Sequence, residues 1–113
     1  MRYVVMLSRV SPDPKVKHFV GLPPELTRGV DTRREMGVAS YLVIETGQEG
    51  VFLFRFDRQG KRVGDTWHEN LDDARDQVSY EYESAVRSWD EIPEDIEDGA
   101  AFGLALLNNR SEP

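Results

Sequence analysis

The run of residues 71–89 constrains the fold most, because its apolar positions recur with the period of an α-helix. Spacings of three and four place one set of residues along a single helical face: Leu71, Ala74, Val78, Tyr82, Ala85 and Trp89. Asn70 precedes the run and can accept the first free backbone amides, and Asp73 completes a capping-box pattern. The sequence therefore predicts one long amphipathic helix over residues 71–88, with Thr66 as a competing cap one turn earlier.

Segments rich in β-branched and aromatic residues precede this helix and predict a sheet. Residues 2–8 are apolar on both faces, which favours an inner strand. Residues 38–45, 51–57 and 61–67 are joined by short turns that contain glycine and are typical of antiparallel hairpins. The last of these strands is expected to place Val63, Asp65 and Trp67 on one side.

An aromatic strip marks the expected core of this sheet. Phe52, Phe54 and Phe56 alternate along one strand and therefore point to the same face, opposite a row that contains Arg55. Buried aromatic rings dominate core energetics, so we expect the helix over residues 71–88 to pack on this strip.

The remaining segments complete an α+β domain. Residues 18–22 predict a short strand, residues 23–37 a long loop, and residues 108–113 a frayed tail. A short C-terminal helix is predicted from one apolar face: Ile96, Ala100, Gly103 and Leu107. The predicted fold is a single domain over residues 1–113. It has an antiparallel β-meander of about four strands, one long helix on one face of the sheet, and a short C-terminal helix.

Charge and composition restrict the classes of partner. The 113 residues carry a formal net charge of −7, divided into +2 for residues 1–60 and −9 for residues 61–113. A dense negative surface repels nucleic acid and favours a basic protein partner. The phenylalanine strip superficially suits stacking of single-stranded bases, but lysines do not surround it.

The same composition argues against several cofactors and compartments. The absence of cysteine excludes disulfides and thiolate metal ligands. No apolar run is long enough to span a membrane, and no signal-peptide pattern opens the chain, so we expect a cytoplasmic protein without membrane association. Phosphate-loop, dinucleotide-binding and nucleophile-elbow motifs do not occur, and no cofactor is predicted.

The hypothesis of a small enzyme or metal-binding protein depends on Asp65 and His68. One histidine with neighbouring carboxylates supplies nitrogen and oxygen ligands, although 21 acidic residues make such proximity common. A simpler interpretation is that His68 flanks the turn between strand and helix, and that Asp65 bonds backbone amides in that turn. No catalytic or metal-ligating residue is assigned.

Binding through the helix is the first functional hypothesis. The outer face of the helix over residues 71–88 carries the candidate partner-binding residues: Asp73, Asp76, Tyr80 and Glu83. Tyr80 is an aromatic residue on a polar face, and tyrosine is enriched in interface hot spots. This pattern predicts a non-enzymatic interaction module of the immunity or inhibitor type that binds a basic partner.

Two further possibilities stay open at this point. The sheet face away from the helix is expected to carry Tyr41, Val43, Val51 and Leu53, and an exposed apolar patch there would favour a homodimer. A regulatory ligand-binding module would instead place a pocket between the sheet and residues 23–37.

The motif Gly64-Asp65-Thr66-Trp67-His68, followed by an acidic helix with Ala74, Glu81 and Trp89 and then Ile92-Pro93, resembles a group of short uncharacterised bacterial proteins. In that group a β-hairpin leads through an Asp-Thr-Trp-His element into one long helix. The resemblance covers residues 38–93 and implies a fold without implying an activity. In size, acidity and α+β layout the chain is also similar to bacterial toxin-immunity proteins.

Overall fold

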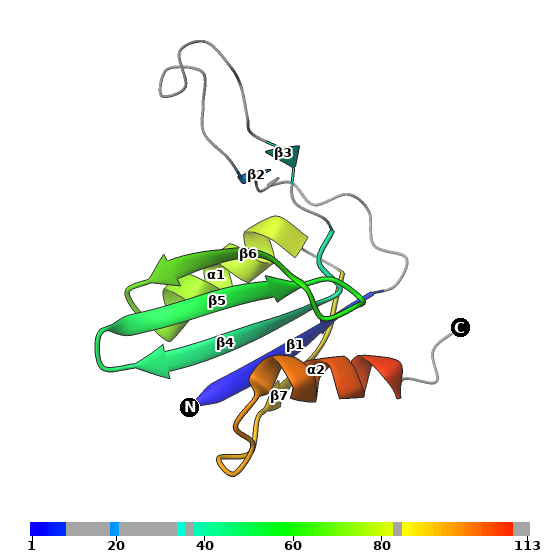
Figure 1. Ribbon diagram of the computed structural model, residues 1–113. Helices are drawn as coiled ribbons and strands as arrows, with labels where there is room; N and C mark the ends of the chain where they lie inside the picture. The colour runs from blue at the N-terminus through cyan, green and yellow to red at the C-terminus, as the bar shows by residue number, and fades with distance from the viewer. Residues whose placement is uncertain (9–18, 21–33, 36–37, 83–84, 110–113) are drawn as a thin grey trace.

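The protein is an α+β fold built on a five-stranded antiparallel sheet, described here from a computed structural model (Figure 1). The structure describes residues 1–8, 19–20, 34–35, 38–82 and 85–109. The strands of the sheet lie in the order β6-β5-β4-β1-β7. Their bounds are Arg2–Leu7 for β1, Tyr41–Gly47 for β4, Gly50–Phe56 for β5, Arg62–His68 for β6 and Val86–Glu91 for β7. The helices are α1, Leu71–Tyr82, and α2, Gly99–Asn108; the short strands β2, Phe19–Val20, and β3, Arg34–Glu35, form a separate pair.

Local turn chemistry sets the meander of β4, β5 and β6, as predicted. Gly50 has φ +135° and closes the β4–β5 hairpin opposite Gly47. At the next turn the Asp57 carboxylate accepts hydrogen bonds from the amides of Gln59 and Lys61, both at 2.9 Å. These bonds mimic a backbone turn and hold β6 antiparallel to β5.

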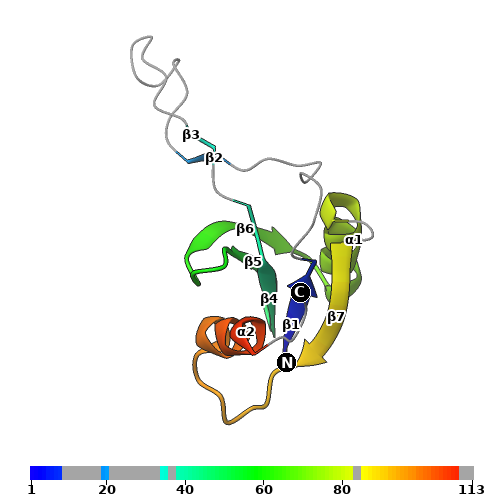
Figure 2. The same cartoon turned by 90° about the vertical axis from the view of Figure 1, so that its right-hand side faces the viewer.

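The two helices pack on opposite faces of the sheet (Figure 2). Helix α1 lies against β5 and β6, whereas α2 lies against β1 and β4 on the other face. The predicted apolar side of α1 is confirmed, because Ala74, Val78 and Tyr82 are buried. Asn70 also acts as predicted, with its side-chain oxygen accepting the Asp73 amide at 2.8 Å.

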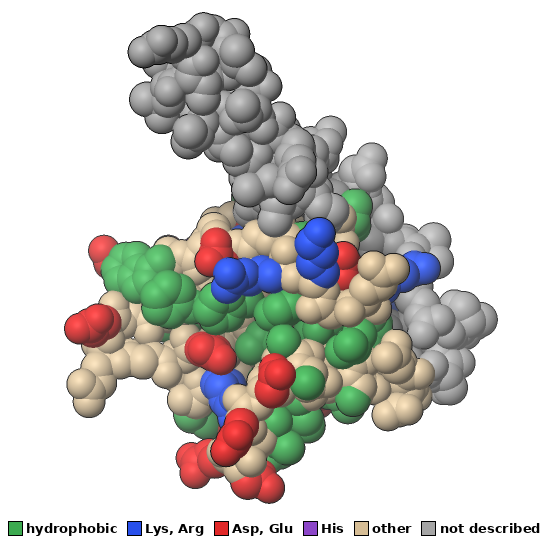
Figure 3. Space-filling model, in the orientation of Figure 1, with side chains coloured by type: hydrophobic (Ala, Val, Ile, Leu, Met, Phe, Trp, Pro, Cys, Tyr) green, Lys and Arg blue, Asp and Glu red, His purple; other side chains and the backbone are tan. Residues whose placement is uncertain are grey.

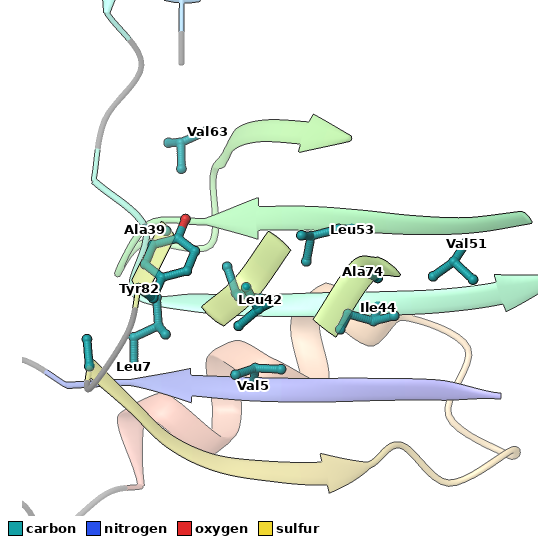
Figure 4. Close-up of a cluster of buried hydrophobic side chains, with 12 residues drawn as sticks. Val5, Leu7, Ala39, Leu42, Ile44, Val51, Leu53, Val63, Ala74 and Tyr82 are labelled. Carbon is teal, nitrogen blue, oxygen red and sulfur yellow. The ribbon is translucent and has the colours of Figure 1, made fainter. Parts of the chain in front are cut away.

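The sheet surface beneath α1 differs from the expectation (Figure 4). Helix α1 covers the row that contains Val51 and Leu53, together with Leu42 and Ile44 of β4. The phenylalanine strip faces the other way, toward α2. Because strand side chains alternate, covering one row with α1 leaves the strip to the second helix.

The predicted helix over residues 71–88 is wrong at its C-terminal end. Helix α1 ends at Tyr82, and residues 86–91 form β7, an additional edge strand. Val5 of β1 pairs with Trp89 of β7 in antiparallel register. The inner position predicted for β1 is therefore confirmed, and the backbone groups along the edge of β1 that faces away from β4 find their partners in β7.

A bulge in β6 overturns the predicted alternation of Val63, Asp65 and Trp67. Arg55 pairs with Gly64, but the next residue of β5 pairs with Arg62, so one extra residue is accommodated in β6. Gly64 adopts φ +154°, which L side chains rarely take. Val63 consequently enters the core beneath α1, while Asp65 and Trp67 are exposed.

The C-terminal helix is confirmed, with a later start than its apolar pattern indicates. Asp98 caps α2 by accepting the Ala101 amide at 3.0 Å. Gly103 faces the sheet so closely that a Cβ atom at this position would lie 2.5 Å from the Tyr41 ring. The missing side chain therefore sets the distance between α2 and the sheet.

Some predicted segments lie partly or wholly outside the described residues. The short strand predicted over residues 18–22 is present as β2. Of the expected loop over residues 23–37, only β3 is described. Of the expected tail, residues 110–113 fall outside the description, and Asn108 ends α2. Among the described residues, no helix has both the length and the apolar character that crossing a bilayer requires.

Candidate functional site

The outer face of α1 is acidic and exposed, as the sequence predicts. Asp72, Asp73, Asp76 and Tyr80 are exposed along this face, and the Asp73 carboxylate is also bonded to His68 of β6 at 3.0 Å. Tyr80 exposes 57% of its side chain. Glu83, the fourth predicted partner-binding residue, lies outside the described residues.

Nearby arginines of the described chain are directed away from this acidic face. Arg75 belongs to α1, but its guanidinium lies 5.0 Å from the centre of the Trp89 ring of β7. Arg55 is buried beneath the helix. Among the described residues, no arginine therefore reduces the negative field of Asp72 and Asp76.

A second acidic surface follows β7 and leads into α2. Its exposed carboxylates are Asp90, Glu91, Glu94, Asp95, Glu97 and Asp98. The Arg2 guanidinium holds this segment through its backbone, donating to the carbonyl oxygens of Pro93 and Glu97 at 3.2 Å and to that of Ile96. Acidic side chains gather at the lower edge of the molecule in Figure 3.

An ion pair buried between α1 and the sheet was missed by the sequence analysis. Arg55 and Glu81 are 0% and 2% exposed. The Arg55 Nε donates to Glu81 Oε1 at 3.0 Å, and its Nη2 donates to Glu81 Oε2. Gln77 Nε2 donates to the same Glu81 carboxylate at 2.7 Å. The available signal was an arginine in the apolar row of β5 and a glutamate between two buried helix positions.

His68 joins this buried network instead of a metal or catalytic cluster. Its Nε2 lies 2.7 Å from Thr66 Oγ1, and its Nδ1 lies 3.0 Å from Asp73 Oδ2. Arg55 Nη2 donates to the same Thr66 oxygen at 3.2 Å. Thr66 Oγ1 is therefore shared between the Arg55 guanidinium and His68 Nε2, and the Asp73 carboxylate accepts from Nδ1–H. Both ring nitrogens are therefore used within the fold.

The structure does not bring Asp65 and His68 together. Asp65 is opposite Phe54 on the face of α2, whereas His68 is buried on the face of α1. Within the described ranges, no group of three or more histidine, aspartate or glutamate side chains is placed to hold a metal ion. The order of carboxylate, imidazole and hydroxyl in Asp73, His68 and Thr66 is that of a hydrolase triad. However, neither Thr66 nor His68 lines the cavity beside residues 38–40, the one at the start of α2 or the one at the β4–β5 turn.

The phenylalanine strip changes from buried to exposed along β5. Phe56 is buried and stacks on Tyr41 with 5.1 Å between ring centres. Phe54 is half-buried, and Phe52 exposes 46% of its side chain. Trp67 is opposite Phe52 on β6 and exposes 52%. The strip was predicted as core, and only its Phe56 end is fully buried, because α2 lies over β1 and β4 instead of β5 and β6.

An open groove of about 610 Å³ continues from these aromatic residues toward the start of α2. Phe54, Phe56 and Arg62 line one side, and Glu97 and Asp98 line the other. Figure 3 shows hydrophobic side chains on this face of the sheet. The groove is charged at its rim and aromatic at its floor.

The predicted homodimer surface is not exposed as one patch. Val51 and Leu53 are buried beneath α1, whereas Tyr41 and Val43 are buried beneath α2. The alternative of a ligand pocket against residues 23–37 lies mainly outside the described residues. Comparison with protein-family models, curated proteins and solved structures gave no match.

Proposed function

We propose that this protein is a non-enzymatic interaction module that binds a basic protein partner through the outer face of α1. The observation that carries the proposal is the exposed row of Asp72, Asp73, Asp76 and Tyr80 on a helix whose opposite side is fixed to the sheet. A rigid helix presents these groups without the entropic cost of ordering a loop.

The chemistry of this face suits a partner with clustered lysine or arginine residues. Carboxylates steer a cationic surface during association, and a tyrosine supplies contact area with few rotatable bonds. A protein that itself binds nucleic acid presents such a basic surface. The immunity or inhibitor role is the most concrete version, in which α1 occupies that surface and blocks it.

The test is affinity capture from extracts of the native host, with salt and charge as variables. We expect a basic protein to be retained at low salt and released as salt rises, because exposed charge pairs are screened. Replacing Asp72→Asn and Asp76→Asn together should reduce retention by more than about tenfold if both act on the partner. For the immunity role, the captured protein should also lose its nucleic-acid binding when the complex forms.

A control variant removes the same amount of charge elsewhere. Glu94→Gln with Asp95→Asn changes two exposed carboxylates of the segment before α2 and leaves α1 intact. This control should retain the partner. Equal loss in both variants would mean that net charge, and not the face of α1, determines binding. Recovery of no basic partner would contradict the proposal directly.

A further inference from the structure

We propose that the protein has a second docking surface, on the sheet face opposite α1, formed by Phe52, Phe54 and Trp67. Its occupant is an extended peptide segment of a protein partner that carries lysine or arginine beside an apolar residue. The inference rests on the proposed function for the basic character of the partner. It assigns the anchoring contacts to a different face, which we call the aromatic shelf.

The aromatic shelf is ordered by contacts within the fold. Phe52 and Phe54 are stacked with 5.8 Å between ring centres and 13° between ring planes. The Trp67 indole lies over Gly50, where a Cβ atom would come within 2.3 Å of its Nε1. Rings that are already held in place lose little conformational entropy on binding. Aromatic residues of this kind are enriched among interface hot spots.

The offset between the two helices leaves the shelf uncovered. Helix α2 packs against β1 and β4, and the adjacent β5 and β6 carry the exposed rings. Strand β6 lies at the edge of the five-stranded sheet. Neighbouring exposed aromatic residues on a sheet are unfavourable in water and indicate a contact surface.

Charge selects the kind of occupant. Asp65 and Glu45 are the strand neighbours of Phe54 and Phe52 on this face, and Glu97 and Asp98 border the adjoining groove. Carboxylates beside aromatic faces attract a cation, whereas they repel a nucleic-acid backbone or a second copy of this acidic chain. A basic peptide therefore matches the shelf better than either alternative.

An intramolecular contact already shows this chemistry. The Arg62 guanidinium lies 5.8 Å from the centre of the Phe54 ring. A cation from this chain thus uses one ring of the shelf, while Phe52 and Trp67 remain exposed to solvent. The structure indicates that a partner cation would occupy the equivalent position on these two rings, with its apolar neighbour directed along the groove.

The probe for the test is a phage-displayed library of random peptides, selected on the wild-type protein. Enriched peptides are expected to combine lysine or arginine with an adjacent apolar residue, and to shift the NMR signal of the Trp67 indole N–H. Trp67→Ser and Phe52→Ser should each weaken binding of a synthetic enriched peptide by more than about tenfold. Both residues are surface-exposed, and unfolding curves verify that the variants fold.

A second variant keeps the aromatic rings of the shelf and reverses the charge of the carboxylates beside them. Asp65→Lys with Glu45→Lys should weaken the basic peptides by a similar factor and select acidic peptides from the same library. Asp72→Asn with Asp76→Asn on α1 should leave peptide affinity within about twofold, because those residues lie on the opposite face.

Several results would overturn the inference. They are no enrichment, enriched peptides without a cationic residue, stronger binding of single-stranded oligonucleotides, or a dimer that Trp67→Ser dissociates. If the α1 variant weakens binding of the peptides and the shelf variants do not, the proposed function stands and the aromatic shelf is not a docking surface. Conversely, peptide binding at the shelf without salt-sensitive capture through α1 would remove the proposed function alone.

Discussion

The buried pair of Arg55 and Glu81 fixes how α1 sits on the sheet. The Arg55 guanidinium donates to both Glu81 carboxylate oxygens, to Thr66 Oγ1 and to the Leu53 carbonyl oxygen. All three of its nitrogens therefore donate a hydrogen bond within the fold. Because these hydrogen bonds are directional, they form only when α1 lies at one particular position along β5. The pair therefore specifies the position of the helix, while apolar burial supplies most of its stabilisation.

Replacing Glu81 alone should lower the free energy of unfolding far more than replacing Arg55 and Glu81 together. Glu81→Ala leaves a buried, unpaired arginine, and we expect a loss of about 3–5 kcal/mol in the free energy of unfolding, measured by urea denaturation. Asp76→Ala, an exposed change on the same helix, should stay within about 0.5 kcal/mol. Arg55→Met with Glu81→Leu should recover most of the loss. A cost below about 1 kcal/mol for Glu81→Ala would contradict this account.

The sequence could not identify Arg55 as a core residue, although its neighbours were assigned correctly to alternating faces. The row of Phe52, Phe54 and Phe56 offers more apolar area than the row ending in Arg55, so area alone favours the wrong face for α1. The arginine is tolerated beneath α1 because Glu81 reaches it across the helix–sheet interface. That pairing depends on residues 26 positions apart, which periodicity does not reveal.

At the scale of elements, the sequence predicts turns and caps well, because their chemistry is local. Asn70 precedes α1 and accepts the Asp73 amide, as predicted, whereas the Asp98 cap of α2 was not assigned from the sequence. The C-terminal end of α1 is not predicted by local sequence, because the helical spacing of apolar residues continues to Trp89 without a break. What ends the helix is the unpaired edge of β1, which residues 86–91 satisfy as β7. Tertiary pairing overrides the helical pattern there.

The contact between α2 and the sheet depends on Gly103. Alanine has the higher helix propensity by about 1 kcal/mol, so Gly103→Ala would stabilise an isolated helix. In this fold a Cβ atom would lie within 2.6 Å of two Tyr41 ring carbons, and the ring is fully buried. We therefore expect Gly103→Ala to lower the free energy of unfolding by about 1–3 kcal/mol.

Thermal and urea unfolding followed by circular dichroism would measure this effect. The matched control is Ala105→Gly at an exposed position of α2, which should cost about 1 kcal/mol through propensity alone. A Gly103→Ala protein as stable as the wild type would show that α2 moves away from the sheet without loss.

At the scale of the whole molecule, the described residues form two cores, one on each side of the five-stranded sheet, covered by helices that are offset from each other. Helix α1 covers β5 and β6 on one face, and α2 covers β1 and β4 on the other. The offset explains why one molecule presents both an acidic helix and an exposed aromatic shelf. It also places one buried tyrosine in each core, Tyr82 beneath α1 and Tyr41 beneath α2.

These tyrosines should make the whole fold sensitive to alkali. Burial raises the pKa of Tyr41 to about 12, with the Asp57 and Asp98 carboxylates adding to the shift. Burial also raises the pKa of Tyr82 well above its usual value, and the Glu81 carboxylate contributes. Both phenols ionise more readily in the unfolded chain, where the pKa is about 10. The stabilisation from keeping them neutral is therefore complete below about pH 10 and is lost as the pH rises toward 12.

Urea unfolding at a series of alkaline pH values measures this loss. Above about pH 10, each tyrosine should lower the free energy of unfolding by up to about 1.4 kcal/mol per pH unit. Tyr82→Phe removes one titrating group with a raised pKa and should flatten the slope. Equal slopes for Tyr82→Phe and the wild type would mean that Tyr82 ionises as easily in the folded protein as in the unfolded chain. The core beneath α1 would then be open to water, which its burial in the structure contradicts.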